Sequence, residues 1–145
     1  MSVIISGNSG AAEYFGNNVF EVGEVIAVHG TSLLRASGSV LIIGKNAELP
    51  SHISVFAAVV DADSDFDCEC LRGTAVISCG MSGRNTVSIT SCTNESITLS
   101  LNRSIMTLAG ICEPFELPIR RLRGTTNHDC MAAFAAAVLQ GTAGH

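Results

Sequence analysis

The stretch from Thr86 to Arg103, TVSITSCTNESITLSLNR, constrains the fold most, because two kinds of side chain alternate along it. Val, Ile or Leu occupies alternate positions on both sides of Asn94 and Glu95, and the positions between them are mostly Ser or Thr. A period of two is typical of a β-strand with one buried face. The stretch therefore predicts an antiparallel hairpin whose aliphatic face meets the core. Its other face is uncharged and is a candidate contact surface.

Short apolar segments separated by turn residues recur along the rest of the chain. Residues 40–43 are apolar throughout and residues 53–60 are apolar except for Ser54, which indicates strands buried on both faces or the wall of a barrel. Pro114 and Pro118 lack an N–H group, so the segment around them is predicted to be an edge or crossing segment. The pattern favours a mostly β fold, an antiparallel sandwich or small barrel of short strands, forming a single domain over residues 1–145.

One C-terminal α-helix is predicted after the β segments. Thr125, Thr126 or Asn127 can cap its start, Asp129 complements the N-terminal dipole, and Gly141 ends it. One helical stripe is apolar, and it consists of Met131, Phe134, Ala135, Val138 and Leu139. The opposite face is alanine, at positions 132, 133, 136 and 137. Two arrangements would cover that alanine face, a neighbouring subunit or a second layer of the same domain.

Charged residues are scarce. They make up 14% of the chain, against roughly 25% in an average soluble domain. Lys45 is the only lysine, although lysine normally dominates exposed surfaces and is depleted at interfaces. This scarcity predicts that part of the surface is covered by other copies of the chain. The net charge of −5 argues against nucleic acid as a partner, because phosphate contacts need clustered basic residues.

Targeting signals do not stand out in the sequence. No apolar run approaches the roughly 20 residues that span a bilayer, and the first ten residues lack the basic region of a secretory signal. We therefore expect no membrane partner and a cytoplasmic location, as for an assembly that forms inside the cell. In that reducing compartment the six cysteines are expected to be thiols.

An acidic run, Asp61, Asp63, Asp65 and Asp67, is the densest group of oxygen ligands. Alternating aspartates resemble the first half of a calcium-binding EF-hand loop. The resemblance ends there, since Phe66 stands where glycine is required and Arg72 where a bidentate glutamate is required. Two interpretations remain, a Ca²⁺ site and a solvated acidic turn. No other cofactor is expected.

His128 and Cys130 form the most enzyme-like pair, because a thiol at a helix start is activated and a histidine can act as its base. Residues so close on a helix point in different directions, so any catalytic partner has to come from elsewhere in the fold. The alternative is that both residues serve capping and core packing. No nucleophile elbow of the form G-x-S-x-G occurs.

Three arginines, Arg120, Arg121 and Arg123, lie just before the predicted helix. They predict either an anion site or an interface that pairs with carboxylates of a partner. Taken together, the sequence favours a non-enzymatic structural subunit of a symmetric homo-oligomer, such as a ring, shell or tube. A virion or phage structural protein is one such subunit, and further assembly subunits would be its partners. The alternatives are a small oligomeric enzyme with a His/Cys/Arg site between subunits and a Ca²⁺-binding β module.

Overall fold

The computed structural model describes residues 2–28, 33–64 and 69–143. In chain order the elements are β1 (Ser2–Ser6), α1 (Ala11–Gly16), β2 (Glu24–Val28), β3 (Leu33–Ile43), β4 (His52–Asp61), the 3₁₀ turn η1 (Glu69–Leu71), β5 (Ala75–Cys79), β6 (Val87–Cys92), β7 (Ser96–Leu101), β8 (Ile105–Thr107), β9 (Gly110–Cys112), β10 (Phe115–Arg120) and α2 (Asn127–Leu139). The fold is mostly β with one long helix near its end, as the sequence predicts. None of the helices in these ranges is long and apolar enough to cross a lipid bilayer.

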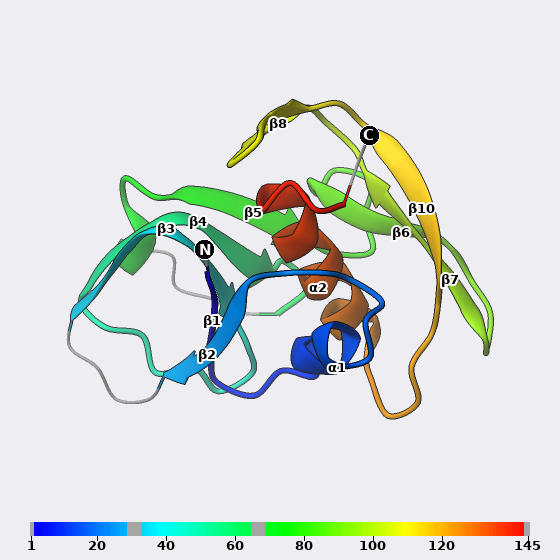
Figure 1. The fold of residues 1–145 in the computed structure, drawn as a ribbon, viewed down its shortest axis with the longest axis horizontal. Coiled ribbons are helices and arrows are strands. Elements are labelled where there is room, and N and C mark those ends of the chain that lie inside the picture. The colour runs from blue at the N-terminus through cyan, green and yellow to red at the C-terminus, as the bar shows by residue number, and fades with distance from the viewer. Residues whose placement is uncertain (1, 29–32, 65–68, 144–145) are drawn as a thin grey trace.

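One eight-stranded sheet forms the body of the molecule, in the order β10-β7-β6-β5-β4-β3-β1-β2. Figure 1 shows this sheet curving around α2, which lies in the centre of the fold. A separate two-stranded hairpin, β8 and β9, continues from the β7 side of the sheet and meets the end of α2, where the Leu108 N–H donates to the Leu139 carbonyl at 2.8 Å. The sheet and α2 therefore enclose one main core.

The predicted antiparallel sandwich or barrel is wrong for most of this sheet. The strands from β2 across to β6 pair in parallel, and only β6–β7 and β7–β10 are antiparallel. The physical reason is visible in residues 40–43 and 57–60, which are apolar and buried, because strands covered on both faces are continuously apolar and such strands are typical of parallel sheets. Parallel neighbours need long connections, which are usually helical. Here the described residues of the β3–β4 and β4–β5 connections form irregular segments and η1, so the sequence contains no sign of connecting helices.

Those irregular segments cover the outer face of the sheet. A second apolar cluster forms there, in which Leu41 and Ala58 are fully buried and Leu71 of η1 is 2% exposed. Ala47 and Leu49 of the β3–β4 connection pack against the same cluster. The connections thus cover the outer face of the sheet, and α2 covers the inner face.

The predicted hairpin is confirmed as β6 and β7, with Leu99 opposite Ile89 and the turn at Asn94 and Glu95. The aliphatic positions of β7, Ile97, Leu99 and Leu101, are at most 1% exposed. The proline-containing segment is the edge strand β10, as predicted.

Helix α2 begins and ends as its sequence predicts. Thr126 is the N-cap: its Oγ1 accepts the Asp129 N–H at 3.1 Å, and Asp129 Oδ2 accepts the Thr126 N–H at 2.8 Å. At the other end Gly141 has φ +79, which lets its N–H reach Val138 and the next N–H reach Ala137, a Schellman motif. Every residue from Asp129 to Leu139 is buried within this chain, the four alanines of the reverse face at 0% exposure. Of the two arrangements that the sequence allowed for that face, the structure has the second layer of the same domain.

Candidate functional site

A hollow of about 780 Å³ lies beside the C-terminal end of β10. Its walls are residues 94–96 at the β6–β7 turn, residues 118–120 of β10, and residues 121–124 of the loop that leads to α2. Arg120, Arg121 and Arg123, the arginines singled out in the sequence, all line this hollow. The same wall carries the carboxylate of Glu95. The hollow therefore brings three cations and one anion together on an otherwise charge-poor molecule.

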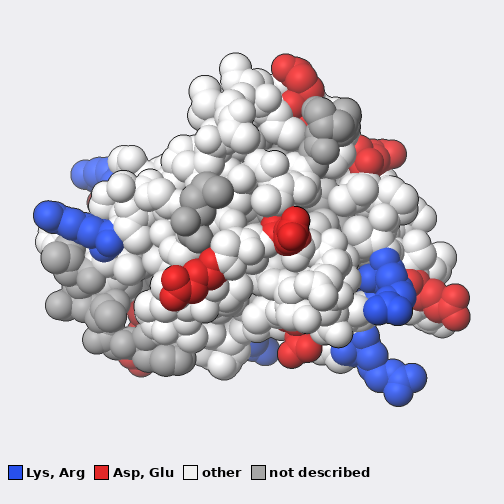
Figure 2. Space-filling model, in the orientation of Figure 1, with Lys and Arg blue, Asp and Glu red and all other residues white. Residues whose placement is uncertain are grey.

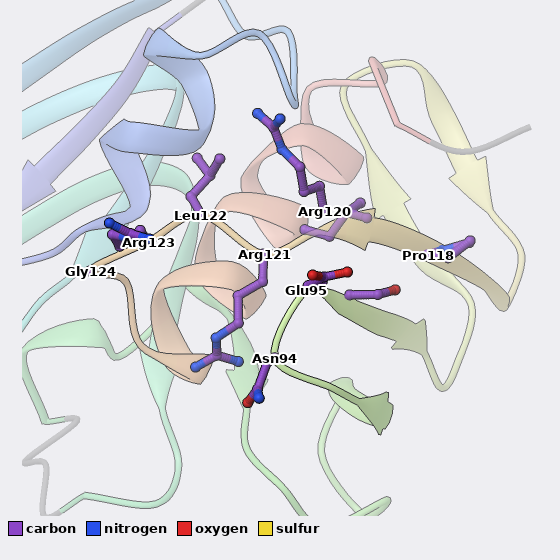
Figure 3. Close-up of a pocket in the computed structure, with 10 residues that line it drawn as sticks. Asn94, Glu95, Pro118, Arg120, Arg121, Leu122, Arg123 and Gly124 are labelled. Atoms are coloured by element: carbon purple, nitrogen blue, oxygen red, sulfur yellow. The ribbon is translucent and has the colours of Figure 1, made fainter.

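The three guanidinium groups occupy different sides of the hollow. Figure 3 shows Arg121 directed toward the side where Asn94 lies, and Arg120 and Arg123 directed away from it. Arg121 is half-buried and held in place, because its Nη1 donates to Asn127 Oδ1 at 2.7 Å and contacts Cys92 Sγ at 3.4 Å. Arg120 and Arg123 are exposed. One arginine is thus positioned by the fold and two are able to reorient.

The loop that carries these arginines is anchored from inside the molecule by Tyr14 of α1. The Tyr14 hydroxyl accepts the Leu122 N–H at 3.2 Å and lies 2.8 Å from Thr125 Oγ1, which in turn donates to the Leu122 carbonyl at 2.7 Å. Tyr14 is fully buried. The backbone of the hollow is therefore fixed, although its exposed side chains are not.

Cys130 belongs to this internal cluster and does not lie at the surface. Its Sγ is 2.7 Å from the Tyr14 hydroxyl, and the residue is fully buried. Burial raises the pKa of the Cys130 thiol, against the partial effect of the Tyr14 hydrogen bond. A buried thiol with a raised pKa is a poor nucleophile.

His128 faces a different part of the fold from Cys130. Its Nδ1 lies 3.9 Å from Asp61 Oδ1, at the end of β4. Both ring nitrogens are buried and have no hydrogen-bond partner within the described ranges. The structure thus places the two sequence-predicted catalytic candidates beside different neighbours, Tyr14 and Asp61, and brings no dyad together.

The first half of the acidic run is part of a turn. Asp61 Oδ1 accepts the Asp63 N–H, and Asp63 Oδ2 accepts the Met81 N–H, each at 3.0 Å. Asp65 and Asp67 lie outside the described residues. Within the ranges that are described, no three His, Cys, Asp or Glu side chains are grouped as metal ligands. The two aspartates that can be placed thus act as acceptors for the backbone.

Edge strand β2 is the second candidate, as a contact surface. Among the residues that the structure describes, β2 is the last strand of the sheet and pairs with β1 alone. Val25 is 40% exposed and Ile26 is 37% exposed, and the register with β1 puts them on opposite faces of the sheet. Figure 2 shows that charged side chains are sparse on the face of the molecule that it presents. An apolar strand that is open on both faces and along one edge is a site where another strand can add.

The Ser/Thr face of the hairpin is less open than the sequence suggests. Asn102 Nδ2 donates to Ser88 Oγ at 2.8 Å, and Ser100 Oγ donates to Asn102 Oδ1 at 2.7 Å. Ser88 and Ser100 are buried, at 3% and 7% exposure. Only the end near the turn, with Thr90 and Ser96, is exposed.

Sequence reasoning found the arginines but missed Tyr14, Glu95 and the openness of β2. Tyr14 is the only tyrosine of the chain, yet nothing in its local sequence indicates a partner more than a hundred positions away. Glu95 was visible only as a turn residue. The sequence of β2, EVIAV, is typical of a buried strand. The strand is exposed because it is the last described one in the sheet.

This chain matches no protein-family model, no curated protein and no solved structure.

Proposed function

We propose that this protein is a non-enzymatic subunit that associates with copies of itself, and that β2 is the strand through which two copies join. The observation that carries the proposal is the open apolar edge of β2, with Val25 and Ile26 exposed on opposite faces. Monomeric proteins usually protect such edges with lysine, proline or a covering segment. Glu24 is the only charged residue of β2, and the strand contains no proline.

The opposite edge of the sheet provides the contrast. β10 contains Pro118, which has no N–H to donate, and it exposes Glu116 and Arg120. Proline and alternating charges are the features that discourage strand addition. An association that extends the sheet is therefore favoured at β2 and disfavoured at β10.

A two-fold arrangement suits β2. If two copies of the strand pair antiparallel with Ile26 opposite Ile26, Glu24 of each copy falls opposite Val28 of the other, and the two glutamates do not face each other. Val25 then falls opposite Ala27, so apolar side chains meet on both faces of the joined sheet. Such a contact is isologous, the type that gives closed dimers.

Other surfaces contribute differently to this proposal. The alanine face of α2 offers nothing, because it is buried within its own chain. Met106 and Ile111 of the β8–β9 hairpin lie opposite each other and are 60% and 67% exposed. They form a second apolar surface through which copies could associate, but this hairpin is separate from the eight-stranded sheet. Growth from a dimer to a ring, shell or tube would need a second contact, and this hairpin is the natural place for it.

Light scattering coupled to size-exclusion chromatography tests the proposal. We expect the wild-type chain to elute at twice its 15.1 kDa mass or more at micromolar concentration. Val25→Lys should give monomers, because lysine cannot be buried at a strand pairing without a partner. Val76→Lys is the matched control: Val76 is 41% exposed, but β5 has a neighbour on each side.

Two results would contradict it. A wild-type monomer under these conditions would remove self-association altogether. Monomers from Met106→Lys together with intact oligomers from Val25→Lys would retain self-association and move the contact from β2 to the hairpin.

A further inference from the structure

We infer that the hollow beside β10, here called the arginine hollow and lined by Arg120, Arg121 and Arg123, binds a small ligand that carries two or more phosphate groups. This inference is independent of the proposed self-association, because the hollow lies at the β10 edge and β2 is the last strand at the other edge.

Unpaired positive charge is the first argument. The chain has eight Lys and Arg residues and a net charge of −5, yet three of the eight line this one hollow. Among the described residues, only Arg72 and His128 have a carboxylate oxygen within 4.0 Å. No carboxylate oxygen of the described residues thus lies within 4.0 Å of the three guanidinium groups, and Glu95 is the one acidic residue that lines the hollow. Arginine pairs with phosphate through two parallel hydrogen bonds, so phosphate is the anion that this side chain suits best.

The way the hollow is built is the second argument. The Arg121 guanidinium donates to Asn127 Oδ1, and the Arg121 backbone N–H donates to the backbone carbonyl of Glu95 at 2.9 Å. The loop behind it is held by the Tyr14 hydroxyl. Part of the cost of ordering a binding site has therefore been met by folding, before any ligand arrives.

Shape and lining narrow the ligand class. A volume of about 780 Å³ falls in the range of small-molecule sites, roughly 300–1,000 Å³. The arginines stand on different sides of the hollow (Figure 3), an arrangement that suits a chain of several linked phosphates better than one phosphate. None of the ten lining residues is aromatic, so no ring is available to stack on a nucleobase. The geometry points to recognition of linked phosphates by charge, with no reading of a base.

Glu95 allows a prediction about the direction in which a substitution changes the affinity for phosphates. Its carboxylate lines the same hollow and repels an anion there. Replacing Glu95 by Gln keeps the size of the side chain and removes the negative charge. We expect Glu95→Gln to bind phosphates more tightly than the wild type.

Calorimetric titration with inorganic tripolyphosphate is the test. We expect saturable binding by the wild type that weakens as salt is added, and weaker binding of inorganic monophosphate. Arg120→Gln/Arg123→Gln should lose about tenfold or more in affinity, since two charge-assisted hydrogen bonds are removed. The control, Arg35→Gln/Arg84→Gln, changes the net charge equally at exposed arginines outside the hollow and should stay within about twofold.

The inference is overturned if the wild type shows no binding of tripolyphosphate, if both double variants lose affinity equally, or if monophosphate binds as tightly as tripolyphosphate. All four arginines replaced are exposed, so the variants should keep the wild-type circular dichroism and melting temperature. The monomeric Val25→Lys variant should bind tripolyphosphate as the wild type does, so failure of either proposal can be told from failure of the other.

Discussion

Asp129 shows how much a single side chain contributes to this fold. One carboxylate oxygen accepts the Thr126 N–H at the start of α2, and the other accepts the Gly10 N–H at 2.9 Å, just before α1. The two helices are thus tied together by one buried residue. A Cβ atom at Gly10 would collide with the Asp129 carboxylate, so any larger residue there would displace this carboxylate. The sequence indicated that Asp129 complements the helix dipole, but the link to Gly10 required the fold.

Replacing Asp129 by Ala should lower the free energy of unfolding by roughly 2–4 kcal/mol, because two N–H groups lose their acceptor. Thr126→Ala removes only the cap and should cost about 1 kcal/mol. Urea denaturation of both variants measures the difference. Equal losses in the two variants would show that the link to Gly10 is not stabilising.

His128 presents the opposite case, because its buried ring nitrogens make no hydrogen bond within the described ranges and the Asp61 carboxylate lies 3.9 Å from Nδ1. Since neither ring nitrogen has a hydrogen bond within the described ranges, His128→Leu removes a desolvation cost. We expect the free energy of unfolding to stay unchanged or to rise by about 1 kcal/mol. A loss of several kcal/mol in the same urea experiment would reveal that the imidazole has a partner after all.

At the scale of elements, α2 explains both what could be predicted and what could not. Its cap, its end and its apolar stripe were predicted from local residues, because capping and helical periodicity are local properties. The burial of its alanine face was not decided by sequence, since it depends on a sheet built from strands more than a hundred residues apart. Parallel pairing was missed for the same reason: the apolar runs of β3 and β4 indicated two covered faces but did not identify the cover.

The buried alanine face leads to a prediction about size. Ala133 is 0% exposed, so Ala133→Leu forces extra atoms into a filled space and should destabilise the protein by about 1–3 kcal/mol. Ala75→Leu, at an exposed position of β5, should change the stability by less than about 0.5 kcal/mol. Thermal and urea unfolding compare the two. Tolerance of leucine at Ala133 would mean that the alanine face is not packed as described.

For the molecule as a whole, buried cysteine and tyrosine side chains with raised pKa values predict a lower free energy of unfolding at high pH. Burial raises the pKa of Cys79 far above its ordinary value near 9.0, and it raises the pKa values of Cys130 and Tyr14 as well. Above pH 9.0 for the two cysteines and above pH 10.0 for Tyr14, the unfolded chain releases these protons while the folded chain keeps them. Because the unfolded state then binds fewer protons, stability falls as the pH rises.

We therefore expect the free energy of unfolding to be level near neutral pH and to decline above pH 9, by about 1.4 kcal/mol per pH unit for each such proton. Urea denaturation at a series of alkaline pH values gives this slope. Cys79→Ala should reduce the slope by about one proton, whatever it does to the overall stability. A slope that is the same in the variant and the wild type would show that Cys79 does not keep its proton on folding.

The candidate sites also differ in how far the sequence reveals them. The arginine cluster is contiguous, so it could be identified from spacing alone, but the hollow in which it lies is made by the β6–β7 turn and needed the structure. The openness of β2 follows from strand order, which no local pattern encodes. The neighbours of His128 and Cys130, Asp61 and Tyr14, come from other elements, so the sequence could not show that the two residues face different partners.

The central position of α2 has a consequence for how the protein is made. The helix follows every strand of the sheet in chain order, so the ribosome has synthesised all of these strands before it synthesises the helix. A nascent chain that ends at Gly124 would expose to water the part of the inner face that α2 covers. The sheet can therefore reach its final form only after the closing helix has emerged from the exit tunnel.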